Sequence, residues 1–377
     1  MEWNRIIVGD CRDTLRTLPD GVFQTVVTSP PYWGLRDYGT AQWDGGDPAC
    51  DHAMRVTAGA TSQRVGRTYQ QGMPHRDCHC GARRIDSQIG LEPTPDEFVD
   101  VMVNVFREVR RVLADDGALW LNLGDSYAGS WGNQGRKEDR GGQRAVNGPM
   151  FQTVDDERYP SRDSNTGKVP PGLKAKDLVG VPWRVAFALR DDGWYLRSDV
   201  IWAKPNPMPE SVEDRPTKAH EYVFLMAKSS TYHYDGTPIR EAQSDLTFER
   251  YAPGQTKTSP KKNADDPRVK SAAPFPLQVQ ADGKRNARSV WSIPTAPYAG
   301  AHFATFPPAL AQRCILATSR IGDGVLDPFF GTGTVGEVAE SLGRRWVGLE
   351  LNPRYAALAA RRTAQMGLPF GGGEVGP

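Results

Sequence analysis

The chain has 377 residues, with 46 Lys and Arg against 45 Asp and Glu and a formal net charge of +1. This balance excludes a uniform polycation that would hold nucleic acid by bulk charge, so any nucleic-acid site must be a local patch. The 39 glycines and 30 prolines exceed the usual share in a globular chain, so we expect long loops.

Targeting and redox signals are weak in this sequence. No run approaches the roughly 18 apolar residues of a membrane span, and the first residues do not form a basic and then apolar signal segment. We therefore expect a cytoplasmic protein. Its five cysteines are too few and too unevenly spaced for a disulfide scaffold, and close pairs in a reducing compartment more often bind metal.

Apolar runs and periodicities predict the elements in chain order. Residues 6–8 and 22–27 are typical of buried strands, with a helix around 14–18 between them. A helix with one buried face follows from 95 to 113, ended by Gly117, and its apolar positions predict core packing only. The remaining predicted elements are strand 118–123, a helix and strand within 179–202, strand 221–226, helix 308–318, strand 324–327, helix 334–342, strand 346–350 and helix 353–362. Strands that alternate with helices predict an α/β fold with a mostly parallel sheet.

Three polar stretches interrupt this pattern and account for the extra glycine and proline. Residues 40–90, 126–178 and 236–290 lack a sustained apolar period, so we expect insertions in a core made of 1–39, 91–125, 179–235 and 291–377. Basic residues gather in the same insertions. We expect the first to bind zinc and the other two to contribute to the recognition of DNA phosphates and bases.

A glycine-rich turn lies near the end of the chain. Residues 331–336 match G-x-G-x-x-G between a predicted strand and helix, and Glu350 ends the next strand, as in dinucleotide sites. Asp327, however, would oppose a pyrophosphate. A cationic ligand without phosphate fits better, and S-adenosylmethionine offers an ammonium and a sulfonium group, while Glu350 can accept from both ribose hydroxyls. The alternative is a tight turn with no ligand.

A proline-rich loop directly follows the predicted strand 22–27. In Ser29-Pro30-Pro31-Tyr32 the prolines restrict the chain and remove backbone donors, which leaves the Ser29 hydroxyl and nearby carbonyls as acceptors. Tyr32 adds a flat face on which a base can stack. This arrangement suits a planar group that carries an amine, although a rigid turn with core aromatic residues is an alternative.

Together these motifs resemble the amino-group DNA methyltransferases, which methylate cytosine N4 or adenine N6. The similarity rests on residues 28–33, 327–333, 344–352 and 302–307, and the catalytic loop precedes the cofactor motif, as in the β-class order. It implies a Rossmann-like, S-adenosylmethionine-dependent methyltransferase sheet. It also implies that Asp10 contacts the adenine side of the cofactor and that Phe306 and Pro307 lie near its amino-acid end. The full predicted cofactor set is Asp10, Cys11, Phe306, Pro307, Asp327, Pro328, Phe329, Gly331, Thr332, Gly333, Glu350 and Asn352, and the predicted catalytic set is Ser29, Pro30, Pro31 and Tyr32.

The expected reaction is direct transfer of a methyl group to the amine of a flipped base in double-stranded DNA. Ser29 stands where the adenine enzymes of the family more often carry Asp, which favours cytosine N4 over adenine N6. A methyltransferase of RNA or protein and a catalytically silent DNA-binding protein are the other interpretations. A cognate restriction nuclease is a possible partner, and the sequence predicts neither the recognition sequence nor the oligomeric state.

Two cysteine pairs lie in the first insertion. Cys50 and His52, with Cys78 and Cys80, could form a closed tetrahedral zinc site that anchors a loop poor in apolar residues. The C-x-H and C-x-C spacings are tighter than in most zinc sites. His75 and His79 are rival ligands, and surface thiols without metal are the alternative.

Overall fold

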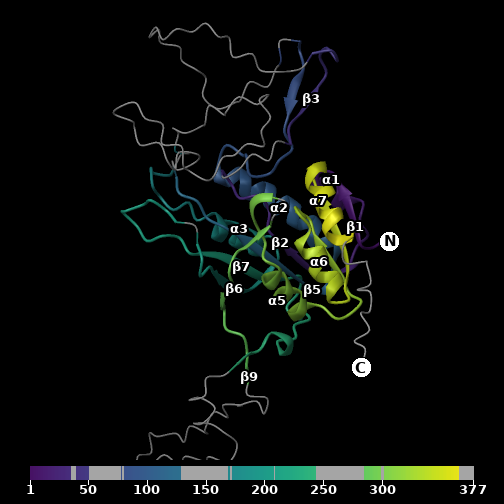
Figure 1. Cartoon of the computed structure of the whole chain (residues 1–377), viewed down its shortest axis with the longest axis vertical. Helices are drawn as coiled ribbons and strands as arrows, with labels where there is room; N and C mark the ends of the chain where they lie inside the picture. The colour runs from purple at the N-terminus through teal and green to yellow at the C-terminus, as the bar shows by residue number, and fades with distance from the viewer. Residues whose placement is uncertain are drawn as a thin grey trace, which may run out of the picture.

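The computed structural model describes residues 1–34, 40–50, 78, 80–128, 169, 172–207, 209–242, 284–298 and 301–364. An eight-stranded sheet forms its centre, with helices on both sides (Figure 1). In spatial order the strands are β1 (Arg5–Val8), β14 (Arg345–Glu350), β13 (Gly324–Asp327), β2 (Phe23–Thr28), β5 (Leu113–Leu123), β7 (His220–Ala227), β6 (Tyr195–Ala203) and β10 (Val290–Ser292). Only β7 in this described sheet runs against its neighbours. The predicted α/β class with a mostly parallel sheet is confirmed.

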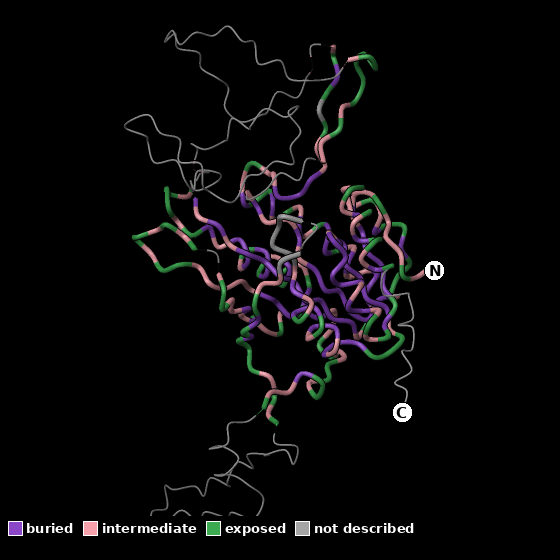
Figure 2. The backbone as a smooth tube through the Cα atoms, viewed as in Figure 1, coloured by how far each residue is buried: buried purple, intermediate pink, exposed green. Residues whose placement is uncertain are grey.

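The central strands are buried on both faces because helices cover both sides of the sheet. Every residue of β2 and β13 is buried, and Val26 of β2 pairs with Leu326 of β13 on one side and Leu119 of β5 on the other. Figure 2 shows the buried backbone gathered in these strands, with exposed segments around them. The sheet is therefore the rigid frame of the molecule.

Helices form one layer on each face of the sheet, and each layer has its own hydrophobic core. The first layer comprises α1 (Cys11–Arg16), α2 (Pro95–Val112) and α3 (Val181–Asp191). The second comprises α5 (Pro308–Thr318), α6 (Thr334–Ser341) and α7 (Pro353–Ala364). The first core contains Phe98, Met102 and Phe106 of α2, which confirms that this helix packs against the sheet as its periodicity predicted.

The junction between α2 and β5 differs from the prediction. The helix ends at Val112 and β5 starts at Leu113, whereas we expected Gly117 to mark the helix end and the strand to begin at 118. Leu113 is buried and pairs with Phe23, and the register shifts before Ala118. Gly117 lies inside this irregular stretch, where an added Cβ would meet Leu113 at 2.3 Å. The glycine therefore serves a distortion of the strand.

Smaller elements lie in and beside the predicted insertions. They are the antiparallel pairs β3 (Gln42–Asp44) with β4 (Arg83–Ile85), β8 (Glu241–Ala242) with β9 (Lys284–Arg285), and β11 (Ala296–Tyr298) with β12 (Ala301–Thr305), together with the short helix η1 (Thr237–Ile239). The β3–β4 pair projects from the body near the top of Figure 1. Most of the 126–178 and 236–290 insertions lies outside the described residues. Within the described part, no helix is long and apolar enough to span a membrane.

The chain direction brings many element ends to one edge of the sheet. Strands β1, β14, β13, β2 and β5 all finish at this carboxyl edge, and α1, α6 and α7 begin there directly after a strand. Because β7 is antiparallel, it starts at the same edge, where Tyr222 pairs with Leu123. Ligands of open α/β sheets bind at this edge, and the candidate site lies there.

Candidate active site

Asp327 lies at the carboxyl end of β13 and is only 5% exposed. Its carboxylate accepts hydrogen bonds from Thr28 Oγ1 at 2.6 Å and from the Phe329 amide at 3.0 Å. Burial raises the pKa of Asp327 to about 7, the two hydrogen bonds oppose the rise, and the nearby Glu350 carboxylate adds to it. The bond from Thr28 joins the predicted cofactor strand to the strand that carries the catalytic loop.

Glu350 ends β14 and faces the glycine loop. One of its oxygens accepts from the Gly331 amide and the other from the Asn352 amide, each at 2.7 Å. Burial raises the pKa of Glu350 to about 7 in spite of these backbone donors. A carboxylate has about four acceptor positions, so both oxygens retain capacity for a diol. The buried Asp327 and the partly buried Glu350 thus both have raised pKa values, and the Glu350 carboxylate is near enough to raise that of Asp327, an arrangement that favours a cationic ligand.

Glycine is required in the loop between β13 and α6. Gly333 has a φ of +83°, and a Cβ there would lie 2.9 Å from the Ala359 Cβ on α7. Gly331 has a φ of +53° and turns its amide towards Glu350. Thr332 is buried, and its hydroxyl accepts from Arg362 at 3.4 Å. The loop is therefore held against α7 as well as against the end of β14.

The aromatic residues of the loop after β13 and of the segment before α5 differ in how far they are buried. Phe330 is buried and stacks on Trp346 with ring centroids 5.1 Å apart. Phe329 is half-buried beside the first core. Pro328 is buried, Phe306 packs partly against the second core, and Pro307 precedes the first turn of α5. Phe329 and Phe306 thus keep partly exposed surface, whereas Phe330 is a packing residue.

Asp10 follows β1 and caps the start of α1. It accepts from the Arg12 amide at 2.9 Å and pairs with the Arg12 guanidinium, which also donates to the Ser87 carbonyl at 3.0 Å. Burial opposes ionisation, but the bonds from Arg12 outweigh it and hold the pKa of Asp10 below its usual value. The Cys11 side chain is buried in the first core, and burial raises the pKa of its thiol to about 12. Its thiol is therefore a packing group.

The proline loop leaves β2 and packs tightly. Pro30 is buried, Pro31 and Tyr32 are half-buried, and Trp33 donates to the Glu92 carbonyl at 2.9 Å. A Cβ at Gly124 would lie 2.5 Å from the Tyr32 ring, so the ring rests on the chain just after β5.

The hydroxyl groups of Ser29 and Tyr32 lie 3.3 Å apart at this edge. The Tyr32 hydroxyl also reaches Asn122 Oδ1 at 3.1 Å and Glu221 Oε2 at 2.7 Å. Glu221 pairs in turn with Lys204. The structure thus brings the predicted Ser29 and Tyr32 together with three polar residues that the motif does not contain.

Sequence reasoning missed Asn122, Glu221 and Lys204. Two features of the sequence could have indicated these residues. Asn122 interrupts an apolar strand one residue before its end, and Glu221 is a charged residue near the start of another apolar strand. They could not be combined because the antiparallel direction of β7, which brings Glu221 to this edge, is not readable from its apolar run. Arg36, Asp37 and Tyr38, which follow the loop, lie outside the described residues.

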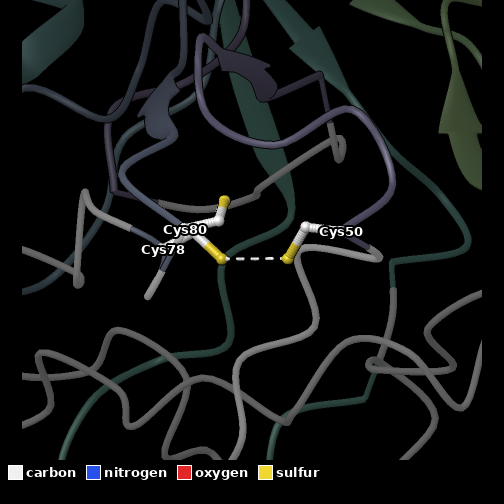
Figure 3. Close-up of side chains that lie close together, drawn as sticks. All are labelled: Cys50, Cys78 and Cys80. Atoms are coloured by element: carbon white, nitrogen blue, oxygen red, sulfur yellow. Dashed lines mark hydrogen bonds between the residues drawn. The ribbon is translucent and has the colours of Figure 1, made fainter.

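The three described cysteines of the first insertion lie together beside the β3–β4 pair (Figure 3). Their sulfur atoms are all within 4.8 Å of one another, and the Cys50 and Cys78 sulfurs are 3.6 Å apart. Burial opposes ionisation of Cys80, but backbone donors including the Ala82 amide lower its pKa to about 6. His52, the fourth predicted ligand, and the rivals His75 and His79 lie outside the described residues.

Comparisons with known proteins agree with this architecture. The chain is 42% identical over 358 residues to the Type II methyltransferase M.SmaI of Serratia marcescens, a match that covers 95% of this chain and 90% of the relative. It is 40% identical to the Type II methyltransferase M.Cfr9I of Citrobacter freundii, over 94% of this chain and 85% of that protein. The solved structure of the PvuII DNA methyltransferase, described as cytosine-N4-specific, superposes with a TM-score of 0.53 at 17% identity, over 98% of this chain and 87% of that one.

The fold and the edge of acidic residues define a Rossmann-like methyltransferase sheet. The DNA methylase family N6_N4_Mtase matches residues 23–361. The chain belongs to this family, and it is an S-adenosylmethionine-dependent DNA methyltransferase that acts on amino groups.

Proposed function

We propose that the chain transfers a methyl group to the N4 amine of a cytosine that is flipped out of duplex DNA. The observation that supports transfer at this edge is the hydrogen bond from Thr28, next to Ser29, to Asp327, and the neutral Ser29 supports cytosine as the target. A base in a duplex cannot enter a site at the edge of a sheet, so the target must leave the stack. Adenine N6 is the alternative target.

The donor groups fit S-adenosylmethionine. Asp327 and Glu350 are two carboxyls with raised pKa values, and a sulfonium and an ammonium group offset the burial of their charges. When bound, this cofactor supplies the methyl carbon: the N–C bond forms as the C–S bond breaks, sulfur keeps the electron pair, and the alkylated nitrogen releases a proton to solvent. We propose that Glu350 accepts the ribose hydroxyls, that Asp10 lies on the adenine side, and that Phe306 and Pro307 lie near the amino-acid end.

The proline loop orients the amine. The Ser29 hydroxyl and the carbonyls beside Pro30 accept the hydrogens of the amine, which draws the nitrogen lone pair out of the ring and towards the methyl group. Tyr32 supports the base with its ring. A neutral hydroxyl at position 29 favours cytosine, whereas the adenine enzymes of this family more often carry Asp there.

The test uses the full chain, tritiated S-adenosylmethionine and genomic DNA from a host that lacks amino-group methylation. Nucleoside analysis should place the label in N4-methylcytosine, and label in N6-methyladenine would instead identify adenine as the target. Ser29→Ala should lower transfer by about 100-fold while the affinity for the cofactor stays within a factor of two. Thr17→Ala, which removes an exposed hydroxyl at the C-terminal end of α1, is the matched control. If Ser29→Ala methylates DNA at the parental rate, the loop has a different role.

We propose that the insertions 126–178 and 236–290, which carry basic residues, recognise the DNA. Because relatives such as M.SmaI are Type II methyltransferases, we propose that the chain serves restriction and modification, with a cognate nuclease as partner. Methylated genomic DNA should then resist a nuclease of the same recognition sequence. Full cleavage of that DNA would contradict this assignment.

We also propose a structural zinc ion at Cys50, Cys78 and Cys80, with His52 as the fourth ligand. The 3.6 Å between the Cys50 and Cys78 sulfurs is near the ~3.8 Å edge of a tetrahedron with Zn–S bonds of about 2.3 Å. A disulfide would require about 2.05 Å. Strands β3 and β4 pair with each other, and Cys50, which follows β3, lies beside Cys78, 28 positions later in the sequence.

Metal analysis of the purified chain tests the zinc proposal. We expect about one zinc per chain, and Cys78→Ser should reduce it below about half an equivalent. Cys314→Ala removes a thiol that is buried in the second core and serves as the control, with zinc content unchanged. A parental protein with less than half an equivalent of zinc would refute the site.

A further inference from the structure

Glu221 occupies a position that the motif of the proline loop does not explain. It is the second residue of β7, and it pairs in register with Trp202 of β6, next to the point where Asn122 and Leu123 end β5. The Glu221 side chain is 16% exposed, so its charge is largely removed from water. A buried carboxylate of this kind needs a counter-charge and donors.

The structure supplies both. Glu221 Oε1 pairs with Lys204, whose side chain is also 16% exposed and lies 4.4 Å from the Trp202 ring centroid. Glu221 Oε2 accepts from the Tyr32 hydroxyl at 2.7 Å and from Asn122 Nδ2 at 3.1 Å. One oxygen of Glu221 thus faces the Lys204 ammonium, and the other oxygen faces the Ser29 loop.

Hydrogen-bond chemistry then sets the direction of the chain of hydroxyls. A carboxylate only accepts, so the single proton of the Tyr32 hydroxyl points towards Glu221. Asn122 uses its amide hydrogens on Glu221 and on the Tyr222 carbonyl, the latter at 3.0 Å, so it offers only its oxygen to Tyr32. Because the Tyr32 proton points to Glu221, Ser29 is the donor in the hydrogen bond of 3.3 Å between the Ser29 and Tyr32 hydroxyls.

We propose that Glu221, held by Lys204, is a positioning residue that orients the Ser29 hydroxyl through Tyr32. With its proton directed to Tyr32, Ser29 presents its lone pairs to the target amine. Without the carboxylate, Tyr32 keeps only the neutral acceptor Asn122 Oδ1 at 3.1 Å, so its hydroxyl can rotate and donate to Ser29 instead. The Ser29 proton would then turn towards the amine and repel the donor that the reaction must bind. This inference rests on the proposed transfer at the Ser29 loop.

The test measures single-turnover methylation at saturating cofactor and DNA. In Glu221→Gln the Lys204 ammonium should take the amide oxygen, so the amide hydrogens face Tyr32 and its acceptor is lost. This variant should slow transfer by about 100-fold, with the dissociation constant of S-adenosylmethionine within a factor of two of the parental value. Tyr32→Phe should slow transfer to a similar extent, since it interrupts the same chain. The combined variant should be no slower than Tyr32→Phe alone, because residues that act as a unit are not additive.

Further variants separate orientation from folding. Glu221→Gln leaves the Lys204 ammonium without its carboxylate. Glu221→Leu with Lys204→Met restores neutrality and offers Tyr32 no acceptor at position 221, so it should regain the parental melting temperature while transfer stays slow. Glu108→Gln removes an acid that pairs with Arg111 on α2, and it should keep the parental rate.

Each outcome has a distinct meaning. If the losses from Glu221→Gln and Tyr32→Phe multiply, or if the neutral double variant regains full activity, Glu221 is only a structural residue and the proposal is overturned. Ser29→Ala in the same assay examines the proposed function itself: loss there with no loss in Glu221→Gln rejects the orientation alone, whereas no loss in Ser29→Ala rejects transfer at this loop.

Discussion

Asp327 makes the stability of the cofactor-free protein depend on pH. Its pKa is about 7 in the folded protein, mainly because it is buried, against an ordinary value of 3.8. Between these values the folded state holds a proton that the unfolded chain has lost, so the unfolding free energy falls as pH rises. The slope for one proton is about 1.4 kcal/mol per pH unit, which gives a loss of ~2–3 kcal/mol between pH 5 and 7.

Asp327→Asn should remove this loss and keep the local geometry. The amide oxygen of the variant can still accept from Thr28 and from the Phe329 amide, but the side chain carries no charge at any pH. We expect similar stabilities for variant and parent near pH 5, and a variant that is ~2–3 kcal/mol more stable at pH 7. Glu350 keeps a raised pKa of its own, so the variant retains part of the slope.

Urea unfolding of both proteins without cofactor, followed by the fluorescence of the 10 tryptophans, measures these differences from pH 5 to 8. Equilibrium dialysis with labelled S-adenosylmethionine measures how the same substitution changes the affinity for the cofactor, because a cationic ligand favours the carboxylate. The variant should bind the cofactor more weakly even though it is more stable. Stability curves that run parallel from pH 5 to 8 would show that Asp327 does not hold a proton, and the reasoning would fail.

Three further substitutions test the packing and the helix starts, each by urea unfolding at one pH. Gly348→Ala places a Cβ 2.2 Å from the Phe330 ring and should cost at least about 2 kcal/mol, and unchanged stability would mean that the ring can move aside. Asp125→Ala removes the acceptor for the first amides of α3 and should cost ~1–2 kcal/mol, with Asp125→Asn milder; equal losses would contradict a capping role. Thr94→Ala should cost about 1 kcal/mol at the start of α2, and Thr94→Ser should restore it.

The helices and central strands were largely predictable because burial on two faces leaves a direct trace in the sequence. The run before Ser29 became β2, and the spacing of Phe98 and Met102 indicated the buried face of α2. The direction of the strands and their register could not be predicted from the sequence. Nothing in the residues around Gly117 distinguishes a helix end from a distorted strand, since glycine suits both.

The candidate site was predictable only where residues adjacent in sequence carry it. Ser29 and Tyr32 belong to one loop, and Asp327 and Gly331 to another, so each motif could be recognised separately. Glu221 contacts Tyr32 of the first loop and pairs with Lys204, which follows β6, and no local pattern marks such contacts between strands. Such residues became visible only with the sheet topology.

The order of strands in the sheet also bears on how the enzyme is made. Strand β1 pairs with β14 and β2 with β13, so neighbours at the active edge come from opposite ends of the chain, and Thr28 and Asp327 are separated by 299 positions. A ribosome adds roughly 5–20 residues per second, so the Ser29 loop emerges many seconds before Asp327. During that interval the growing chain cannot assemble the cofactor edge. Interrupted synthesis therefore leaves silent fragments, and methylating activity appears only when β13 and β14 have closed the sheet.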